Sequence, residues 1–177
     1  MKIYFYFAIL ILIIACKPKD EVSTPTTVLQ MDSIYTASDF RAYGDYYKSG
    51  HQVYAIDLLS DGLHYDSTWH ISGSGCNLYL SDIFAHKDST TRLPAGTYTM
   101  DSTAREITFL RGTSFDDNIT GTYLLSIEND QIQRIILFTR GTMTIDYIDD
   151  DVVLNFHLYL ADSTLYRATY TGPFTYR

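Results

Sequence analysis

Cysteine is nearly absent from this sequence, which contains only Cys16 and Cys76. Two cysteines cannot build the disulfide framework that stabilises many small secreted domains. The hydrophobic core must therefore stabilise the fold, and the roughly 140 residues beyond the N-terminal segments are enough to bury one of ordinary size. We interpret Cys76 as a small buried residue rather than as a nucleophile.

Basic residues are also scarce: 13 Lys and Arg residues stand against 21 Asp and Glu residues, which gives a formal net charge of −8. Beyond the N-terminal region the cations are scattered singly from Arg41 to Arg177 and form no stripe of the kind that phosphate contacts require. The composition therefore excludes nucleic acid as a partner. It also excludes peripheral attraction to an anionic lipid surface.

Helical periodicity is the third absence, because only Ser81–Asp88 could take one or two helical turns. From Ala37 onward Val, Ile, Tyr, Phe and Thr dominate, and apolar residues alternate with polar ones. In Asp151–Ala161 the alternation places Val152, Leu154, Phe156, Leu158 and Leu160 on one face. That pattern is typical of a half-buried strand.

Similar runs recur along the rest of the chain, and Gly, Asn, Asp and Ser separate them as turn residues. The other predicted strands are Asp39–Tyr47, His51–Leu59, Gly62–Ile71, Cys76–Phe84, Gly96–Met100, Glu106–Leu110, Gly121–Glu128, Gln131–Thr139, Gly141–Ile148, Leu165–Tyr170 and Phe174–Tyr176. We therefore expect one all-β domain over residues 37–177, an antiparallel β-sandwich or partly closed barrel of about eight to eleven short strands.

The N-terminal segment has the layout of a signal peptide over residues 1–15. One cation, Lys2, precedes an apolar run that is shorter than the ~20 residues of a spanning helix. The stretch Ile13-Ile14-Ala15-Cys16 resembles the lipobox of bacterial lipoproteins. That resemblance implies lipidation of Cys16 and stable membrane anchoring, because several acyl chains hold a protein where one does not. The alternative is an ordinary cysteine in a secretory signal or short membrane anchor.

Charged residues follow Cys16 directly. Lys19, Asp20 and Glu21 resemble the surface-export signal of Bacteroidetes lipoproteins, which implies an outer-membrane protein that faces outward. The alternative is a solvated charged linker. Residues 16–36 contain Ser, Thr and Pro without periodicity, and we expect them to form a flexible tether.

Five Asp-Ser pairs are each followed by Thr or Ile, and they resemble the site at which Bacteroidetes attach O-glycans to exported proteins. The candidate glycosylation sites are Ser33, Ser67, Ser89, Ser102 and Ser163. Turn chemistry is a competing explanation, since Asp-Ser-Thr is also a good hairpin connection.

Chemical motifs are few. The five histidines show no recognised metal-ligand spacing, and the acidic clusters at 116–118 and 146–151 do not match the helix-loop-helix calcium pattern. Turn residues explain those clusters better. The glycine-rich stretch 73–76 fits neither a phosphate loop nor a nucleophile elbow. We therefore predict no catalytic residue, no metal site and no cofactor.

Tyrosine is abundant, with 16 residues in the chain. Several aromatic residues crowd neighbouring predicted strands and are candidates to face a glycan or protein ligand, since exposed rings on a rigid sheet stack and form hydrogen bonds. These candidates are Tyr43, Tyr46, Tyr47, Tyr54 and Trp69. The alternative is that tyrosine is simply a favourable strand residue.

Three functional hypotheses follow. The sequence favours a membrane-anchored, surface-exposed lipoprotein whose non-catalytic β domain binds a glycan or protein. A lipocalin-like carrier of a small apolar ligand requires a closed barrel with an apolar cavity. An exported hydrolase requires titratable groups that converge in a pocket. The β domain itself resembles no family that we recognise.

Overall fold

A computed structural model describes residues 28–30, 35–116 and 118–173 of the chain. The described part is all-β, which confirms the predicted fold class. Its strands are β1 (Val28–Gln30), β2 (Tyr35–Gly44), β3 (His51–Ser60), β4 (Leu63–Tyr65), β5 (Ile71–Gly73), β6 (Gly75–His86), β7 (Gly96–Asp101), β8 (Thr108–Leu110), β9 (Thr113–Phe115), β10 (Asn118–Thr120), β11 (Thr122–Glu128), β12 (Gln131–Leu137), β13 (Arg140–Ile148), β14 (Asp151–Tyr159) and β15 (Leu165–Pro173).

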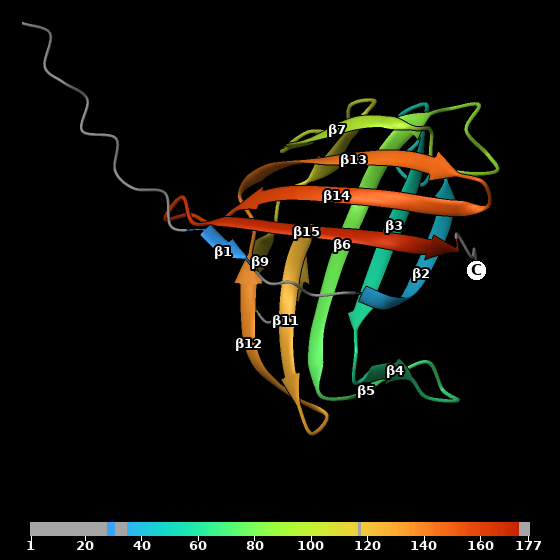
Figure 1. The fold of residues 1–177 in the computed structure, drawn as a ribbon. Helices are drawn as coiled ribbons and strands as arrows, with labels where there is room; N and C mark the ends of the chain where they lie inside the picture. The colour runs from blue at the N-terminus through green and yellow to red at the C-terminus, as the bar shows by residue number, and fades with distance from the viewer. Residues whose placement is uncertain (1–27, 31–34, 117, 174–177) are drawn as a thin grey trace, which may run out of the picture.

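Eleven strands form one nearly closed, barrel-shaped sheet, and β4–β5 and β9–β10 form two small hairpins. In Figure 1 the layer of β7, β13, β14 and β15 runs across the layer of β2, β3, β6, β11 and β12. The short strand β8 joins the two layers by pairing with β7 and β6. On the opposite side β2 approaches β15, where the hydroxyls of Ser38 and Tyr170 lie 2.7 Å apart. Most pairings are antiparallel, but β1–β15 and β7–β8 are parallel.

The alternation of apolar and polar residues directs one face of each layer into a common core. On β14, Val152, Leu154, Phe156 and Leu158 are buried as the sequence predicted. Large aromatic side chains fill the space between the layers, among them Phe40, Tyr98, Phe109, Phe138 and Tyr166. The molecule therefore has one main hydrophobic core, whose burial provides most of the driving force for folding.

Strand β3 is unusual because it is buried on both of its faces. Tyr54, Ile56 and Leu58 point into the main core, whereas Asp57 lies on the outer face and is only 5% exposed. Part of the outer face of this layer is therefore covered. The β4–β5 hairpin contributes to that cover, because Leu63 packs in a small second cluster with Leu59 and Ile127.

The predicted strand Gly62–Ile71 is wrong, since the structure has the β4–β5 hairpin there. The Asp66 side chain explains the turn, because one of its oxygens accepts hydrogen bonds from the backbone N–H groups of Thr68 and His70. Asp residues commonly cap turns in this way. As a result His64 and His70 lie on a hairpin and not along one strand.

A bulge in β6 changes which side chains face outward. Asp82 has a positive φ of 53°, and the pairing of β6 with β3 shifts register between Tyr54 and Ile56. An extra residue of this kind reverses the inward–outward alternation beyond it. Tyr79 and Phe84 therefore both lie on the outer face although they are five residues apart. The segment Ser81–Asp88, the only stretch that could have held a helical turn, belongs mostly to this strand.

Ordered pairing begins upstream of residue 37. Strand β1 pairs with β15 inside the range expected to be a tether, and β2 begins at Tyr35, whose hydroxyl bonds to the Tyr166 hydroxyl in the core. The predicted signal peptide at 1–15 and the predicted strand Phe174–Tyr176 lie outside the described residues. Within the described ranges there is no helix with the length and hydropathy needed to cross a membrane.

Candidate functional site

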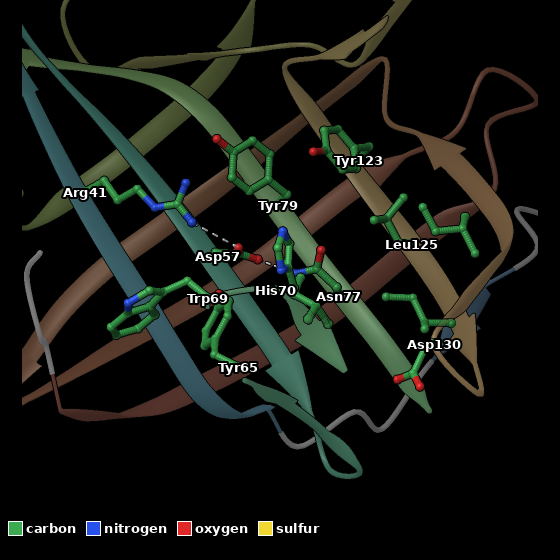
Figure 2. Close-up of a pocket in the computed structure, with 13 residues that line it drawn as sticks. Arg41, Asp57, Tyr65, Trp69, His70, Asn77, Tyr79, Tyr123, Leu125 and Asp130 are labelled. Atoms are coloured by element: carbon green, nitrogen blue, oxygen red, sulfur yellow. Dashed lines mark hydrogen bonds and ion pairs between the residues drawn. The ribbon is translucent and has the colours of Figure 1, made fainter. Parts of the chain in front are cut away.

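The outer face of the β2, β3, β6, β11 and β12 layer carries an open cleft with a volume of about 440 Å³. The β4–β5 hairpin projects beside it, so the cleft has a sheet floor and a hairpin wall (Figure 2). Its lining residues are Arg41, Asp57, Tyr65, Trp69, His70, Ile71, Asn77, Tyr79, Tyr123, Leu125, Ile127, Asp130 and Ile132. A cleft of this size is within the usual range for small-molecule sites, about 300–1,000 Å³.

A row of cross-strand neighbours begins beside the cleft at Asp39 and continues across the cleft floor. Asp39 on β2 is directly opposite Asp57 on β3, which is opposite Tyr79 on β6, which is opposite Tyr123 on β11. The outer-face side chains of four strands that are adjacent in the sheet, β2, β3, β6 and β11, therefore form one row. The row places two carboxylates and two phenol rings side by side.

Two buried carboxylates directly opposite each other repel unless a cation compensates them. Arg41 provides that charge: its Nε donates to Asp39 at 2.7 Å, and one Nη lies 3.5 Å from Asp57. The side-chain amide of Asn77 donates to the other oxygen of Asp57. This network satisfies the buried acids and still leaves one negative charge in excess.

Burial raises the pKa of Asp57 above its ordinary value, while hydrogen bonds from Asn77 and Tyr65 and the charge of Arg41 oppose the increase. Burial likewise raises the pKa of the tyrosines Tyr79 and Tyr123. Both phenols therefore remain protonated at physiological pH and can donate as well as accept hydrogen bonds.

Aromatic rings flank the polar row. The rings of Tyr79 and Tyr123 lie 5.1 Å apart, and on the hairpin the rings of Tyr65 and Trp69 lie 5.9 Å apart. Trp69 is 58% exposed, so its indole is accessible at the edge of the cleft. Figure 2 shows Trp69 and Tyr65 on the hairpin side and Tyr79 and Tyr123 on the sheet side.

A second, smaller pocket of about 260 Å³ shares Tyr79 with the cleft. The structure gathers Tyr43, Tyr46 and Tyr47 there, with the Tyr46 ring in edge contact with both neighbours. The Tyr47 hydroxyl donates to the carboxylate of Asp82 at 2.7 Å. Three of the aromatic residues singled out from the sequence therefore form one exposed cluster beside the cleft.

Tyr54 does not share that position. Its ring is 1% exposed in the main core, and its hydroxyl donates to the Ser89 carbonyl. The inward alternation of β3 places it on the opposite face from Asp57. Its assignment as a ligand-facing residue is corrected accordingly.

Four of the five candidate glycosylation sites lie in described turns or loops, and Ser33 lies outside the described residues. Ser67, Ser102 and Ser163 are exposed, whereas Ser89 is half-buried. At three sites the preceding Asp accepts a hydrogen bond from the backbone N–H of the following Thr. Turn chemistry is therefore present at these sites whether or not they carry a glycan.

The remaining residues considered from the sequence are Cys76, the acidic clusters and the segment that begins at Cys16. Cys76 is half-buried against the core, and burial raises the pKa of its thiol, which disfavours the reactive thiolate. Asp116 and Asp149 occupy hairpin turns with positive φ. In the described ranges no three His, Cys, Asp or Glu residues are placed to hold a metal ion. Cys16, Lys19, Asp20 and Glu21 lie outside the described residues.

Sequence reasoning missed most of the cleft. Arg41, Asp57, Asn77, Tyr79 and Tyr123 were not singled out, although one signal was available. Asp57 interrupts the apolar run of β3 and is the only charged residue within it. A charged residue in a buried strand requires a partner and thus marks a polar site.

Comparisons of the chain with protein-family models, with curated proteins and with solved structures found no match.

Proposed function

We propose that this protein is a lipid-anchored, outward-facing lipoprotein of a bacterial outer membrane whose β domain binds a ligand without catalysis. The observation that supports binding is the outer-face cleft, where aromatic rings flank a polar row on a rigid sheet. Convergent rings and a few fixed polar groups are typical of ligand sites.

The position of the cleft also bears on the kind of binding. The space between the layers is occupied by a continuous cluster of large side chains, whereas the cleft opens to solvent on the outer face. An outer-face site suits an extended ligand such as a glycan chain or a protein segment. It does not suit a small apolar molecule that needs enclosure.

The lipid anchor is tested with Cys16→Ala. Without the thiol no acyl chain can be attached, so the full-length variant should move from the membrane fraction to the soluble fraction on cell fractionation. Cys76→Ala is the matched control and should remain membrane-bound. A Cys16→Ala variant that stays wholly in the membrane fraction contradicts the anchor.

The outward orientation is tested by replacing Lys19, Asp20 and Glu21 together by Ala. If these residues direct surface export, labelling of the protein on intact cells by an impermeant reagent should decrease.

The binding role is tested with Trp69→Ala and Tyr79→Ala. Each variant removes a ring from the cleft wall or floor, and loss of one stacking ring should weaken binding about tenfold or more. Ligands are sought by titrating the full-length protein against cell-surface glycans and extracellular proteins. Phe115→Ala is the control, because this residue is 78% exposed and does not line the cleft. The proposal fails if no bound ligand of either class depends on Trp69 or Tyr79.

A further inference from the structure

The geometry points to an uncharged oligosaccharide as the ligand of the cleft, with acidic glycans rejected. This inference rests on the proposed binding function and names its ligand class. It follows from three features of the described residues: the charge balance of the cleft floor, the polar groups left open to a ligand, and the continuity of the two aromatic pockets.

The charge balance disfavours anionic ligands. Within the described part of the chain, Arg41 is the only Arg or Lys that lines the cleft, and its guanidinium is already shared between Asp39 and Asp57. At the far end Asp130 adds another carboxylate, which accepts hydrogen bonds from the Ser72 hydroxyl and the Gly73 N–H. A uronate or sulfate would meet this excess of negative charge, and no Arg or Lys among the described lining residues is free to bind it.

At Asp57 the same network leaves no open carboxylate oxygen for a cationic ligand. Asp57 is 5% exposed, and its two oxygens already contact Arg41 and Asn77. An ammonium group that approached Asp57 would therefore meet the Arg41 guanidinium and two occupied acceptors. Aromatic rings alone attract cations, but here a fixed cation lies next to them.

The uncharged polar groups of the cleft floor suit the hydroxyls of a ligand. Tyr79 and Tyr123 are half-buried neighbours on the floor, and their phenols both donate and accept. Sugar hydroxyls need such two-way partners, and the exposed indole of Trp69 can stack on the apolar face of a sugar ring. Neither contact requires a charge on the ligand.

The two pockets indicate a chain rather than a single sugar. Tyr79 lines both the cleft and the pocket of Tyr43, Tyr46 and Tyr47, so a ligand can run from one to the other across a shared ring. We therefore expect affinity to rise with the number of sugar units until both pockets are filled.

The experiment titrates the full-length protein in detergent with three sets of oligosaccharides of matched length: neutral hexoses, oligogalacturonates and chitosan oligomers. The neutral set includes several linkages, because the cleft contacts described above select for charge and for hydroxyl groups. Binding of at least one neutral oligomer about tenfold or more tighter than both charged sets supports the inference. Tighter binding of either charged set overturns it.

Two variants separate charge selection from general damage to the site. Asp130→Asn keeps an oxygen acceptor for Gly73 but removes the charge. It should raise the affinity for oligogalacturonates and so narrow the ratio between neutral and acidic oligosaccharide binding. An unchanged ratio overturns the electrostatic explanation. Tyr79→Phe keeps the ring and loses the hydroxyl, so it should weaken neutral binding less than Tyr79→Ala does.

Failure of this inference is distinct from failure of the proposed function. If no oligosaccharide of any set binds, but a protein ligand is captured in a Trp69- and Tyr79-dependent way, the carbohydrate assignment is overturned and the binding role stands. If nothing captured depends on these two residues, both are overturned.

Discussion

At the scale of single residues, Asp57 connects the fold to the cleft. It occupies one position in a strand that is otherwise apolar, and it is kept in place by Arg41, Asn77 and Tyr65. A buried acid of this kind usually costs stability relative to a neutral residue of similar shape, unless its partners compensate fully. The sequence could indicate that such a site exists, but it could not name the partners, because they come from other strands.

The effect of Asp57 on stability should depend on pH. Burial raises its folded pKa, so the folded state holds the proton more tightly than the unfolded chain. Its stabilising contribution is therefore fully present below the unfolded pKa and is lost as pH rises through the folded value. Relative to Asp57→Asn, the wild type should become less stable as the pH rises from about 4 towards neutral. Urea unfolding at a series of pH values measures this difference.

Asp130→Asn is the control for that experiment, because folding lowers the pKa of Asp130 whereas it raises the pKa of Asp57. Hydrogen bonds from the Gly73 backbone and the Ser72 side chain lower the pKa of Asp130. Its contribution is present above the unfolded pKa and is lost as pH falls through the folded value. A difference between wild type and Asp57→Asn that does not vary with pH would contradict the buried-acid interpretation.

At the scale of strands and turns, period-two alternation located most of the strands but neither the β4–β5 hairpin nor the short strands β1, β9 and β10. The run from Gly62 to Ile71 looks like one strand because its residues favour extended structure. Hydrogen bonds from Thr68 and His70 to Asp66, together with a positive φ at Trp69, turn the chain instead. A local capping interaction thus outweighed strand propensity, and the same turn places Trp69 at the cleft.

The corner between β10 and β11 depends on Gly121. Its φ is +79°, and a Cβ at this position would lie 1.9 Å from the Arg111 carbonyl oxygen. Gly121→Ala should therefore lower the free energy of unfolding by about 2 kcal/mol or more, through backbone strain together with a clash. Gly50→Ala is the matched control: its φ is +80° but nothing lies within 4 Å of the added Cβ. Gly50→Ala should lower the free energy of unfolding by only about 1 kcal/mol, because the positive φ is then the sole source of strain. Equal losses in urea unfolding would contradict the close approach.

At the scale of the whole molecule, the all-β fold follows from short alternating strands and turn residues, whereas the choice between a sandwich and a nearly closed barrel came from the structure. The order of the strands does not follow from the sequence pattern either, because pairings such as β3 with β6 and β7 with β13 join segments that are separated in the chain. The cleft depends on that order. Asp39, Asp57, Tyr79 and Tyr123 form one row only because β2, β3, β6 and β11 lie side by side.

One continuous core spanning both layers predicts a single cooperative unfolding transition. Phe156 on β14 is 1% exposed in that core, so Phe156→Ala should lower the free energy of unfolding by about 3–5 kcal/mol. Far-UV circular dichroism reports the sheet, whereas fluorescence reports Trp69, the sole tryptophan of the chain, on the hairpin beside the opposite layer. Because the layers share one core, both signals should shift to lower urea concentration together. Phe115→Ala, at an exposed hairpin position, should leave both midpoints nearly unchanged. If Phe156→Ala shifts the dichroism midpoint and leaves the fluorescence midpoint in place, the two layers unfold separately and the cleft does not depend on the common core.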